Sequence, residues 1–451
     1  IYQAVIQRER NLEYDGEDVE VVPHVPLEII SRIKKAGKKG RADIVIVELG
    51  GTVGEYQQVL FLEAARMLKL EVGRDVLNIH LAYLPIPASI GEMKSKPAQY
   101  SVKTLFSAGI VPDIFIGRAE RPLDKPRIST LSRNTGIPVK SIFSNPDVKS
   151  IYEVPILLNR QRIGERILEL LGYPKQKHPK ISDFARLLKT IQAEKPEVKI
   201  AIVGKYFDTG NFALADSYVS VIEAIKHACW YYRREPKLQW INSKDYEKDP
   251  RRVQELSEFD GVIIPGGFGK TGVEGKIRAV KYIRENKIPY LGLCYGMQMA
   301  IIEFARNLCG LRRAHTTEVD PRTAYPVIDI LPEQKEKMAR HQYGATMRLG
   351  NHKAVLLPKS LVGKAYGKRV VTERHRHRYE VNPKYIKKLE SRGAIFSGRS
   401  PDRRLMEFFE LPPSQHPFFV STQAHPEFLS HPTDPHPLFR DFIKSAIARS
   451  R

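Results

Sequence analysis

Residues 289–308, PYLGLCYGMQMAIIEFARNL, read as an apolar strand, a sharp turn and a helix in direct succession. PYLGL is a short apolar run typical of a buried strand, and the apolar residues after the turn recur at helical spacing. Cys294 lies at the turn with a glycine two residues to either side, a G-x-C-x-G arrangement. Glycines are needed because the strained backbone of such a turn brings its neighbours too close for side chains. The stretch predicts a cysteine presented at a helix N-terminus.

Strands and helices alternate on both sides of this stretch. Apolar runs at 199–206, 260–267 and 418–428 alternate with predicted helices at 216–232, 274–286 and 437–448. A similar alternation fills the first part of the chain, with apolar runs at 42–52, 76–85, 112–119 and 137–144. The pattern predicts an α/β fold with two doubly wound, mostly parallel-sheet domains.

The segment between the two alternating regions is rich in proline and lysine and contains one short amphipathic stretch. We therefore expect domains at 1–172 and 198–451, joined by an interdomain linker at 173–197. The chain starts with Ile1 on a predicted helix, so we expect the first domain to be incomplete at its N-terminus.

Composition excludes some classes of function. Lys and Arg outnumber Asp and Glu to give a net charge of +22, which favours polyanionic partners. Because the basic residues are spread along the chain, we expect solvated surface and nucleotide phosphates to account for them, and no nucleic acid; nucleic-acid binding is the weaker alternative. No apolar run approaches the roughly 20 residues of a membrane span. Three cysteines are too few for a disulfide framework, which favours the cytoplasm.

A thiolate nucleophile with an amine leaving group needs a histidine held by a third group. AHPEF supplies His425, and Glu427 two residues later, after an apolar strand. A helix N-terminus favours the thiolate of Cys294; the alternative is a buried structural cysteine, the reading we prefer for Cys229 and Cys309.

A glycine-rich loop follows the strand at 260–264. In PGGFG, residues 265–269, the glycines allow backbone N–H groups to point at a developing oxyanion, and Gly267 is the candidate donor, with the N–H of Tyr295 as the second. The overlapping G-F-G-K-T-G matches a dinucleotide fingerprint, but the next strand ends in Cys294 where that fold needs a ribose-binding acid.

These motifs resemble the class I glutamine amidotransferases, whose signatures are P-G-G-F/G-G, G-x-C-x-G-x-Q and H-P-E, over residues 199–446. The resemblance implies hydrolysis of glutamine to glutamate and ammonia through a thioester on Cys294, with His425 as base and acid and Glu427 as its orienting group. The residues implied to line the glutamine site are Gly267, Tyr295, Gly296, Met297, Gln298, Glu318 and Arg378.

The remaining segments resemble the CTP synthase family in the same order along the chain: VELGGTVGE (47–55), GEMKSKPAQYSVKTL (91–105), DVKSIYEVP (147–155), VGKY (203–206), GATMRLG (344–350) and ERHRHRYEVN (373–382). The resemblance implies amination of UTP to CTP with ATP and glutamine, in pyrimidine nucleotide biosynthesis, by a P-loop-like synthetase domain next to the amidotransferase domain. It also implies Mg²⁺, allosteric activation by GTP with Arg348 as a candidate contact, feedback inhibition by CTP, and a homotetramer.

Nucleotide and metal residues are carried over from the same resemblance. The resemblance implies that Glu48, at the expected end of the strand in the apolar run 42–52, is a metal ligand and that Asp147 and Val148 bind ATP. The family pattern has an acid at Gln57, threonine at Ala98 and lysine at Arg127, so this chain departs from the family at three positions of the implied CTP site. The implied UTP and CTP site consists of Glu55, Tyr56, Gln57, Lys94, Ser95, Lys96, Pro97, Ala98, Gln99 and Arg127.

No G-x-x-x-x-G-K-[ST] phosphate loop occurs in the 451 residues, although the family carries such a loop upstream of the segments matched here. This leaves two alternatives to a complete synthase reaction. The chain could retain glutamine hydrolysis alone, or act as a non-catalytic structural or regulatory subunit.

Overall fold

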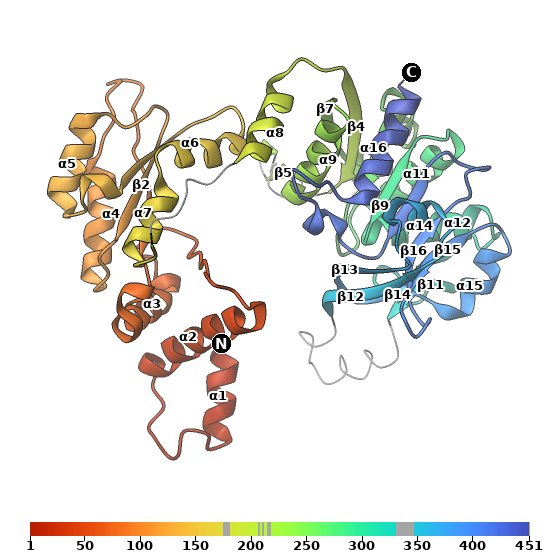
Figure 1. Cartoon of the computed structure of the whole chain (residues 1–451). Helices are drawn as coiled ribbons and strands as arrows, with labels where there is room; N and C mark the ends of the chain where they lie inside the picture. Colours follow the sequence, from red (N-terminus) through yellow and green to blue (C-terminus); the bar gives the residue numbers. More distant parts are fainter. Residues whose placement is uncertain (175–180, 206–207, 210–211, 214–217, 331–346, 451) are drawn as a thin grey trace. The chain divides into compact units, whose positions relative to one another are not determined.

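Each half of the chain builds its own β-sheet. The computed structural model describes residues 1–174, 181–205, 208–209, 212–213, 218–330 and 347–450 (Figure 1). These fall into two units, Ile1–Leu188 and Lys189–Arg451. Parts of the predicted linker 173–197 and of the predicted helix 216–232, with Tyr206 and residues 344–346 of two family segments, lie outside the described residues. Within the described part of the chain, no helix is long and apolar enough to cross a membrane.

The first unit is built on a parallel sheet with the order β1-β2-β3. In-register pairs join Ile79 to Ile114 and Phe115 to Ile142. Helices α4 and α5 pack on this sheet through Ala98, Val102 and Leu131, all of them buried. Its elements are α1 Tyr2–Arg10, α2 Val21–Gly40, a 3-10 turn Tyr56–Gln58, α3 Val59–Val72, a 3-10 turn Gly73–Asp75, β1 Ile79–Tyr83, α4 Lys96–Ser107, β2 Ile114–Ala119, α5 Lys125–Thr135, a 3-10 turn Val139–Ser141, β3 Ile142–Pro146, a 3-10 turn Ile151–Glu153, α6 Val154–Arg160, α7 Ile163–Leu170 and α8 Ser182–Gln192, which crosses the division between the units.

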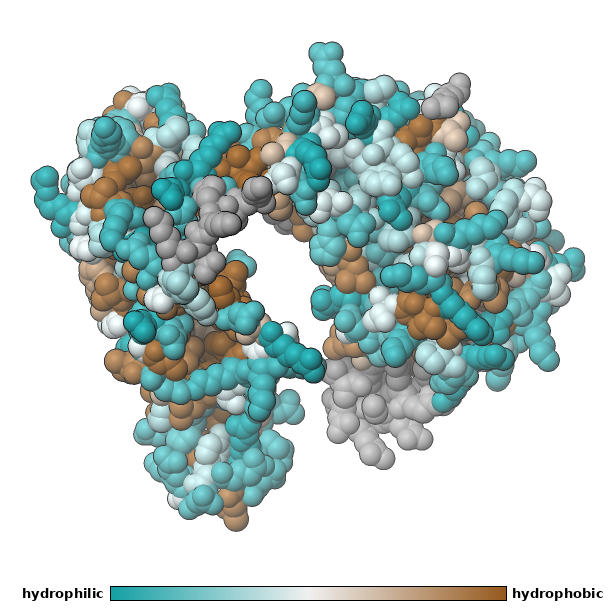
Figure 2. Space-filling view, viewed as in Figure 1, coloured by the Kyte–Doolittle hydropathy of each residue, from teal (hydrophilic) through white to brown (hydrophobic). Residues whose placement is uncertain are grey.

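The predicted strand at 42–52 is wrong, because this segment has no regular secondary structure. A strand needs a neighbouring strand to pair with its backbone N–H and C=O groups. A strand that is apolar on both faces must also be buried on both faces. Among the described strands, none pairs with 42–52, and Ile46 is 92% exposed. Apolar side chains also interrupt the hydrophilic surface of this unit in Figure 2. The segment has the apolar composition of a strand, but composition alone does not supply a neighbouring strand to pair with.

The second unit contains a nine-stranded sheet among its described residues, with the order β13-β12-β15-β16-β17-β9-β8-β4-β7. The α/β prediction is confirmed for both units, and the strands from β17 to β7 pair in parallel. From β17 to β13 the pairs are antiparallel, an extension that the sequence pattern did not indicate. A separate small sheet has the order β10-β11-β14.

The elements of the second unit are β4 Glu197–Gly204, β5 Asp208–Thr209, β6 Phe212–Ala213, α9 Val219–Tyr231, β7 Glu235–Asn242, α10 Ser243–Lys248, a 3-10 segment Pro250–Glu258, β8 Gly261–Ile264, α11 Val273–Glu285, β9 Tyr290–Leu293, α12 Tyr295–Asn307, β10 Ala314–Thr316, β11 Tyr325–Ile330, β12 Arg348–Leu356, α14 Leu361–Tyr366, β13 Val370–His377, β14 Tyr379–Val381, α15 Pro383–Glu390, β15 Ile395–Arg399, β16 Met406–Glu410, β17 Phe419–Thr422, a 3-10 turn Pro426–Leu429 and α16 Pro437–Arg449.

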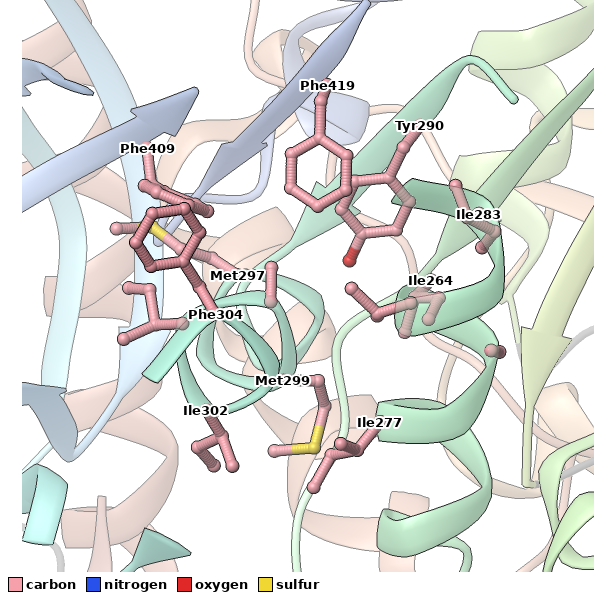
Figure 3. Packing of buried hydrophobic residues seen from close by; sticks show 14 of the residues in the cluster. Ile264, Ile277, Ile283, Tyr290, Met297, Met299, Ile302, Phe304, Phe409 and Phe419 are labelled. Carbon is pink, nitrogen blue, oxygen red and sulfur yellow. The ribbon is translucent and has the colours of Figure 1, made fainter. Parts of the chain in front are cut away.

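Successive residues of the central strands enter opposite hydrophobic cores, as a period of two requires. In β4, Ala201 and Val203 pack on one face, and Ile200 and Ile202 on the other. The first core holds α11 and α12 against the sheet, with Tyr290, Phe304 and Phe419 among the residues drawn in Figure 3. The helix after Cys294 is therefore fixed to the centre of the sheet.

Candidate active site

Cys294 occupies a strained turn between β9 and α12. Its backbone has φ 50° and ψ −97°, and it is the N-cap residue of α12. A positive φ is uncommon for a residue other than glycine and is retained where the surrounding structure enforces it, often at functional sites. The positive end of the helix dipole lies at this N-terminus and favours the anionic form of the thiol.

Glycines flank Cys294 because no side chain fits. A Cβ on Gly296 would lie 2.2 Å from the carbonyl oxygen of Ile264, and one on Gly292 would lie 2.6 Å from the Tyr290 hydroxyl. Neither glycine has a positive φ. Glycine is required at both positions because neighbouring atoms lie too close for a side chain.

Parallel pairing of β17 with β9 brings the histidine segment to the elbow. Thr422 lies opposite Leu293 in the register, and the Thr422 carbonyl accepts a hydrogen bond from the Cys294 N–H at 2.7 Å. Residues 423–427 continue from the same end of the sheet. His425 is held there by its own N–H, which donates to the Arg374 carbonyl at 2.7 Å.

His425 and Glu427 form the orienting pair that the sequence predicted. Nδ1 of His425 lies 2.7 Å from Oε1 of Glu427. The other ring nitrogen, Nε2, is buried, and the ring also interacts with the Cys294 side chain. Burial by itself lowers the pKa of His425, but the nearby Cys294 thiolate and the Glu427 carboxylate outweigh burial and raise the pKa to about 11. The arrangement stabilises a thiolate–imidazolium pair.

The PGGFG loop packs against His425 and Cys294. A Cβ on Gly266 would lie 2.7 Å from Cε1 of His425 and 3.6 Å from Cβ of Cys294. The Tyr295 hydroxyl donates to the Gly269 carbonyl at 2.8 Å, which ties the loop to the first residue of α12. The loop therefore borders the space where an oxyanion on the attacked carbon would form.

The residues predicted for the amino-acid end of glutamine also lie together. Glu318 accepts a hydrogen bond from the Gly269 N–H at 2.7 Å. Burial raises the pKa of Glu318, and the charges of Lys205 and Arg378 act in the opposite direction. A carboxylate and a guanidinium in one place match the ammonium and carboxylate groups of an amino acid. Gln298, on the first turn of α12, is 2% exposed; Gly296 and Met297 are buried beside it.

Two residues that the sequence reading did not identify lie at this site. Gln423 places Nε2 3.6 Å from Sγ of Cys294. Lys276 is fully buried, and its Nζ lies 5.1 Å from the centre of the Tyr295 ring. Burial and the charge of Lys205 lower the pKa of Lys276 to about 7. Pairing of the strand before AHPEF with PYLGL would have identified Gln423, whereas nothing in the sequence marks Lys276.

The other two cysteines occupy structural positions. Cys229 and Cys309 are buried and unpaired, and burial raises the pKa of both thiols. Neither thiol is therefore favoured as an anion at neutral pH.

Arg348, the candidate for GTP contact, takes part in a buried ion-pair network. Its Nη2 lies 2.6 Å from Oε1 of Glu407, and its Nη1 lies 3.5 Å from Oε1 of Glu380. With 11% of its side chain exposed, the guanidinium supports the antiparallel part of the sheet, so the structure does not favour a direct contact with a nucleotide.

In the first unit, several predicted nucleotide residues meet at the carboxyl edge of the parallel sheet. Lys94, in the loop after β1, pairs with Glu92 at 2.7 Å. Arg127, near the start of α5, lies 3.6 Å from Glu92 and donates to the Met93 carbonyl at 3.2 Å. Asp147 follows β3 and accepts from Arg118 at 2.9 Å, with Val148 next in the chain. This edge is where ligands bind in open α/β sheets.

The other predicted UTP-site residues lie at the first turn of α4 and differ in their exposure to solvent. Lys96 and Pro97 are exposed and Ser95 is half-buried. Ala98 is 1% exposed within the core of the unit, so it faces protein and not solvent. Gln99 bonds to Ser95 and Asn134, each at 3.0 Å.

The remaining predicted residues belong to irregular or short structure. Glu55 accepts from the Thr52 N–H at 3.1 Å and from Gln57 at 2.9 Å, while Tyr56 is 95% exposed. Glu48 is exposed, and the described residues contain no cluster of three or more His, Cys, Asp or Glu side chains suited to a metal. A single carboxylate fits a Mg²⁺ ion that takes its other ligands from phosphates and water, the usual way in which this ion is held.

Comparison with known proteins agrees with this division into two units. Residues 1–173 match the family model described as CTP synthase N-terminus, and residues 213–445 match glutamine amidotransferase class-I. CTP synthase of Trichormus variabilis is 46% identical over all of this chain and 81% of that protein. CTP synthase of Thermococcus gammatolerans is 44% identical over all of this chain and 82% of that protein.

A solved structure supports the fold of the second unit. The glutaminase domain of Trypanosoma brucei CTPS, solved with bound acivicin, is 35% identical, with a TM-score of 0.51. The match covers 56% of this chain and 94% of that one. The cysteine elbow, the His–Glu pair and these matches define a class I glutamine amidotransferase unit joined to a synthetase unit. The chain belongs to the CTP synthase family. It is thus an enzyme of the glutamine-dependent C–N ligase class.

Proposed function

We propose that the second unit hydrolyses glutamine at Cys294 and that the ammonia aminates UTP to CTP at the first unit, with ATP consumed. The observation that supports this most directly is the placement of Cys294, on a strained helix N-cap, beside a histidine held by Glu427 at 2.7 Å. This is the geometry of a thiolate nucleophile with a histidine acid and base.

In the first half-reaction, Sγ of Cys294 attacks the carboxamide carbon of glutamine. Negative charge develops on the carboxamide oxygen, where the N–H groups of Gly267 and Tyr295 are the proposed donors. Nε2 of His425 transfers its proton to the departing nitrogen, the C–N bond breaks, and ammonia leaves a glutamyl thioester. His425 then takes a proton from water, which attacks the thioester and releases glutamate and the Cys294 thiolate.

Recognition of glutamine follows from the charges around the loop. We propose that Glu318 binds the α-ammonium group and that Arg378 pairs with the α-carboxylate. Gln298, Gly296 and Met297 line the side-chain portion of the pocket.

In the second half-reaction, the C4 oxygen of UTP accepts a phosphoryl group from ATP, and ammonia then displaces phosphate to form CTP. Lys94, Lys96 and Arg127 lie at or near the carboxyl edge of the sheet, where their positive charges suit a triphosphate. We assign UTP or CTP to these residues with Glu55, Tyr56, Gln57, Ser95 and Gln99, and ATP to Asp147 and Val148. Glu48 would be one protein ligand of Mg²⁺, which supplies charge neutralisation at the phosphates when bound.

Regulation and assembly are proposed from family membership: GTP as activator, CTP as feedback inhibitor and a homotetramer as the assembly. The substrates are nucleoside triphosphates and the three cysteines are unpaired, so we propose the cytoplasm as the compartment.

The test is release of glutamate from glutamine by the purified chain, with and without UTP, ATP, Mg²⁺ and GTP. Cys294→Ala should abolish release, while Cys309→Ala, which also removes a buried thiol, should leave it unchanged. Stimulation by nucleotides would link hydrolysis to the synthetase unit. Release that survives in Cys294→Ala would contradict the assigned nucleophile.

A further inference from the structure

We propose that Gln423 is a further catalytic residue of glutamine hydrolysis, whose side-chain amide donates a hydrogen bond to Sγ of Cys294 and stabilises the thiolate. The inference rests on the proposed role of Cys294 as nucleophile and adds a residue outside the cysteine, histidine and glutamate already assigned. Nε2 of Gln423 lies 3.6 Å from Sγ, and Gln423 is fully buried. A contact with the reacting sulfur atom, shielded from water, acts on the thiolate directly.

The register of the sheet puts Gln423 beside the nucleophile. β17 and β9 run in parallel with Thr422 opposite Leu293, so the next residues along each strand are Gln423 and Cys294. The Gln423 N–H also donates to the Glu407 carbonyl at 2.9 Å, which fixes the backbone from the other side. The backbone position of Gln423 is therefore set by pairing on two flanks.

The direction of the Gln423 amide follows from a chain of hydrogen bonds. The Tyr379 carbonyl can only accept, so the group that faces it at 3.2 Å is the amide nitrogen of Gln298. The same nitrogen lies 3.4 Å from Oε1 of Gln423. With its oxygen turned to Gln298, Gln423 presents its amide nitrogen, a donor, to the sulfur. The Tyr379 carbonyl thus orients Gln298, and Gln298 orients Gln423 so that its amide nitrogen faces the sulfur of Cys294.

A donor at this position has a definite chemical effect. A thiolate carries a full negative charge, and hydrogen bonds to charged groups are about twice as strong as neutral ones. The bond stabilises the thiolate of the free enzyme and again the thiolate that leaves when water opens the thioester. His425 gives a proton to the departing nitrogen in the first step and takes one from water in the second. Gln423 transfers no proton.

The test uses the full chain and the pH dependence of alkylation of Cys294, which needs no turnover. Iodoacetamide is a suitable probe because it carries the same carboxamide group as glutamine. Peptide mass spectrometry separates Cys294 from Cys229 and Cys309, and rates are followed between about pH 5 and pH 9. Gln423→Met and Gln423→Leu both remove the donor and introduce an apolar side chain of similar size, and Gln415→Met changes an exposed glutamine as the matched control.

Loss of the donor should raise the alkylation midpoint of Gln423→Met by about one pH unit, which slows alkylation about tenfold below the midpoint. Gln423→Leu, which also lacks a donor, should raise the midpoint by a similar amount. Gln415→Met should match the wild type. A role in packing alone predicts no shift of the midpoint in either variant that folds.

The proposal is overturned if the alkylation profile of Gln423→Met or of Gln423→Leu coincides with that of the wild type. Should Gln423→Met fail to fold by circular dichroism, Gln423→Leu still tests the loss of the donor. Failure of the proposed function has a different signature, namely glutamate release that persists in Cys294→Ala.

Discussion

Nδ1 of His425 donates its hydrogen bond to Oε1 of Glu427 over 2.7 Å, and the two residues are separated by a single proline. This contact orients the ring so that Nε2 is the nitrogen left for the sulfur and the leaving group. It also adds negative charge beside the imidazolium, one of the causes that raise the pKa of His425 to about 11.

Glu427→Gln should therefore lower the pKa of His425 and reduce glutamate release at least about tenfold at neutral pH. The imidazolium of the thiolate–imidazolium pair is lost as pH rises through the histidine pKa. With that pKa lowered, the alkaline limb of kcat/KM should move to lower pH, which a pH–rate profile measures. Glu390→Gln, at an exposed position outside the site, is the control; an unmoved alkaline limb in Glu427→Gln would rule out the electrostatic role.

Gly296→Ala should destabilise the second unit by about 3 kcal/mol or more, since its Cβ would lie 2.2 Å from a backbone oxygen that cannot move aside cheaply. Urea unfolding measures the loss, and glutamate release should fall with it. Gly164→Ala in α7 is the matched control, because nothing lies within 4 Å of the added methyl group. That change should stabilise α7 by about 0.5–1 kcal/mol. Wild-type stability in Gly296→Ala would refute the close-approach argument.

Lys276→Met should stabilise the second unit at neutral pH. The folded pKa of Lys276 is lowered to about 7, so the unfolded chain binds more protons than the folded chain between about pH 7 and the normal lysine pKa. Stability of the wild type should then rise with pH in this window, by roughly 2 kcal/mol from pH 7 to pH 9. The variant should lose that dependence, as seen from urea unfolding at the two pH values. Equal pH dependence in both proteins would mean that Lys276 is not desolvated as described.

Arg348→Met should destabilise the fold by about 3–5 kcal/mol, because it leaves Glu407 and Glu380 buried without their cation. Burial and the charge of Glu407 raise the pKa of Glu380 to about 8. The folded state therefore holds the Glu380 proton more tightly than the unfolded chain, and this contribution to stability is lost as pH rises toward 8. Arg348→Met/Glu407→Gln should recover part of the loss in a double-mutant cycle. Full additivity of the two single changes would show that the pair is not coupled.

Local patterns in the sequence predicted the elbow, the histidine and its acidic neighbour, and strands β1, β2, β3, β4, β8, β9 and β17 of the two parallel regions, but not the antiparallel strands. These depend on near neighbours: Gly292 and Gly296 lie within two residues of Cys294, and Glu427 within two of His425. The apolar run at 42–52 shows the limit, since its composition is that of a strand and yet it pairs with none of the described strands.

Short local motifs were therefore enough to predict the reactive groups and the family. What surrounds those groups depends on the tertiary structure. Residues 294 and 423 are 129 positions apart, and only the parallel register of β17 with β9 makes Gln423 a neighbour of the nucleophile. Lys276 on α11 likewise becomes a buried cation only because that helix packs beside the first turn of α12. Burial and long-range pairing are properties of the folded chain as a whole, so no local pattern encodes them.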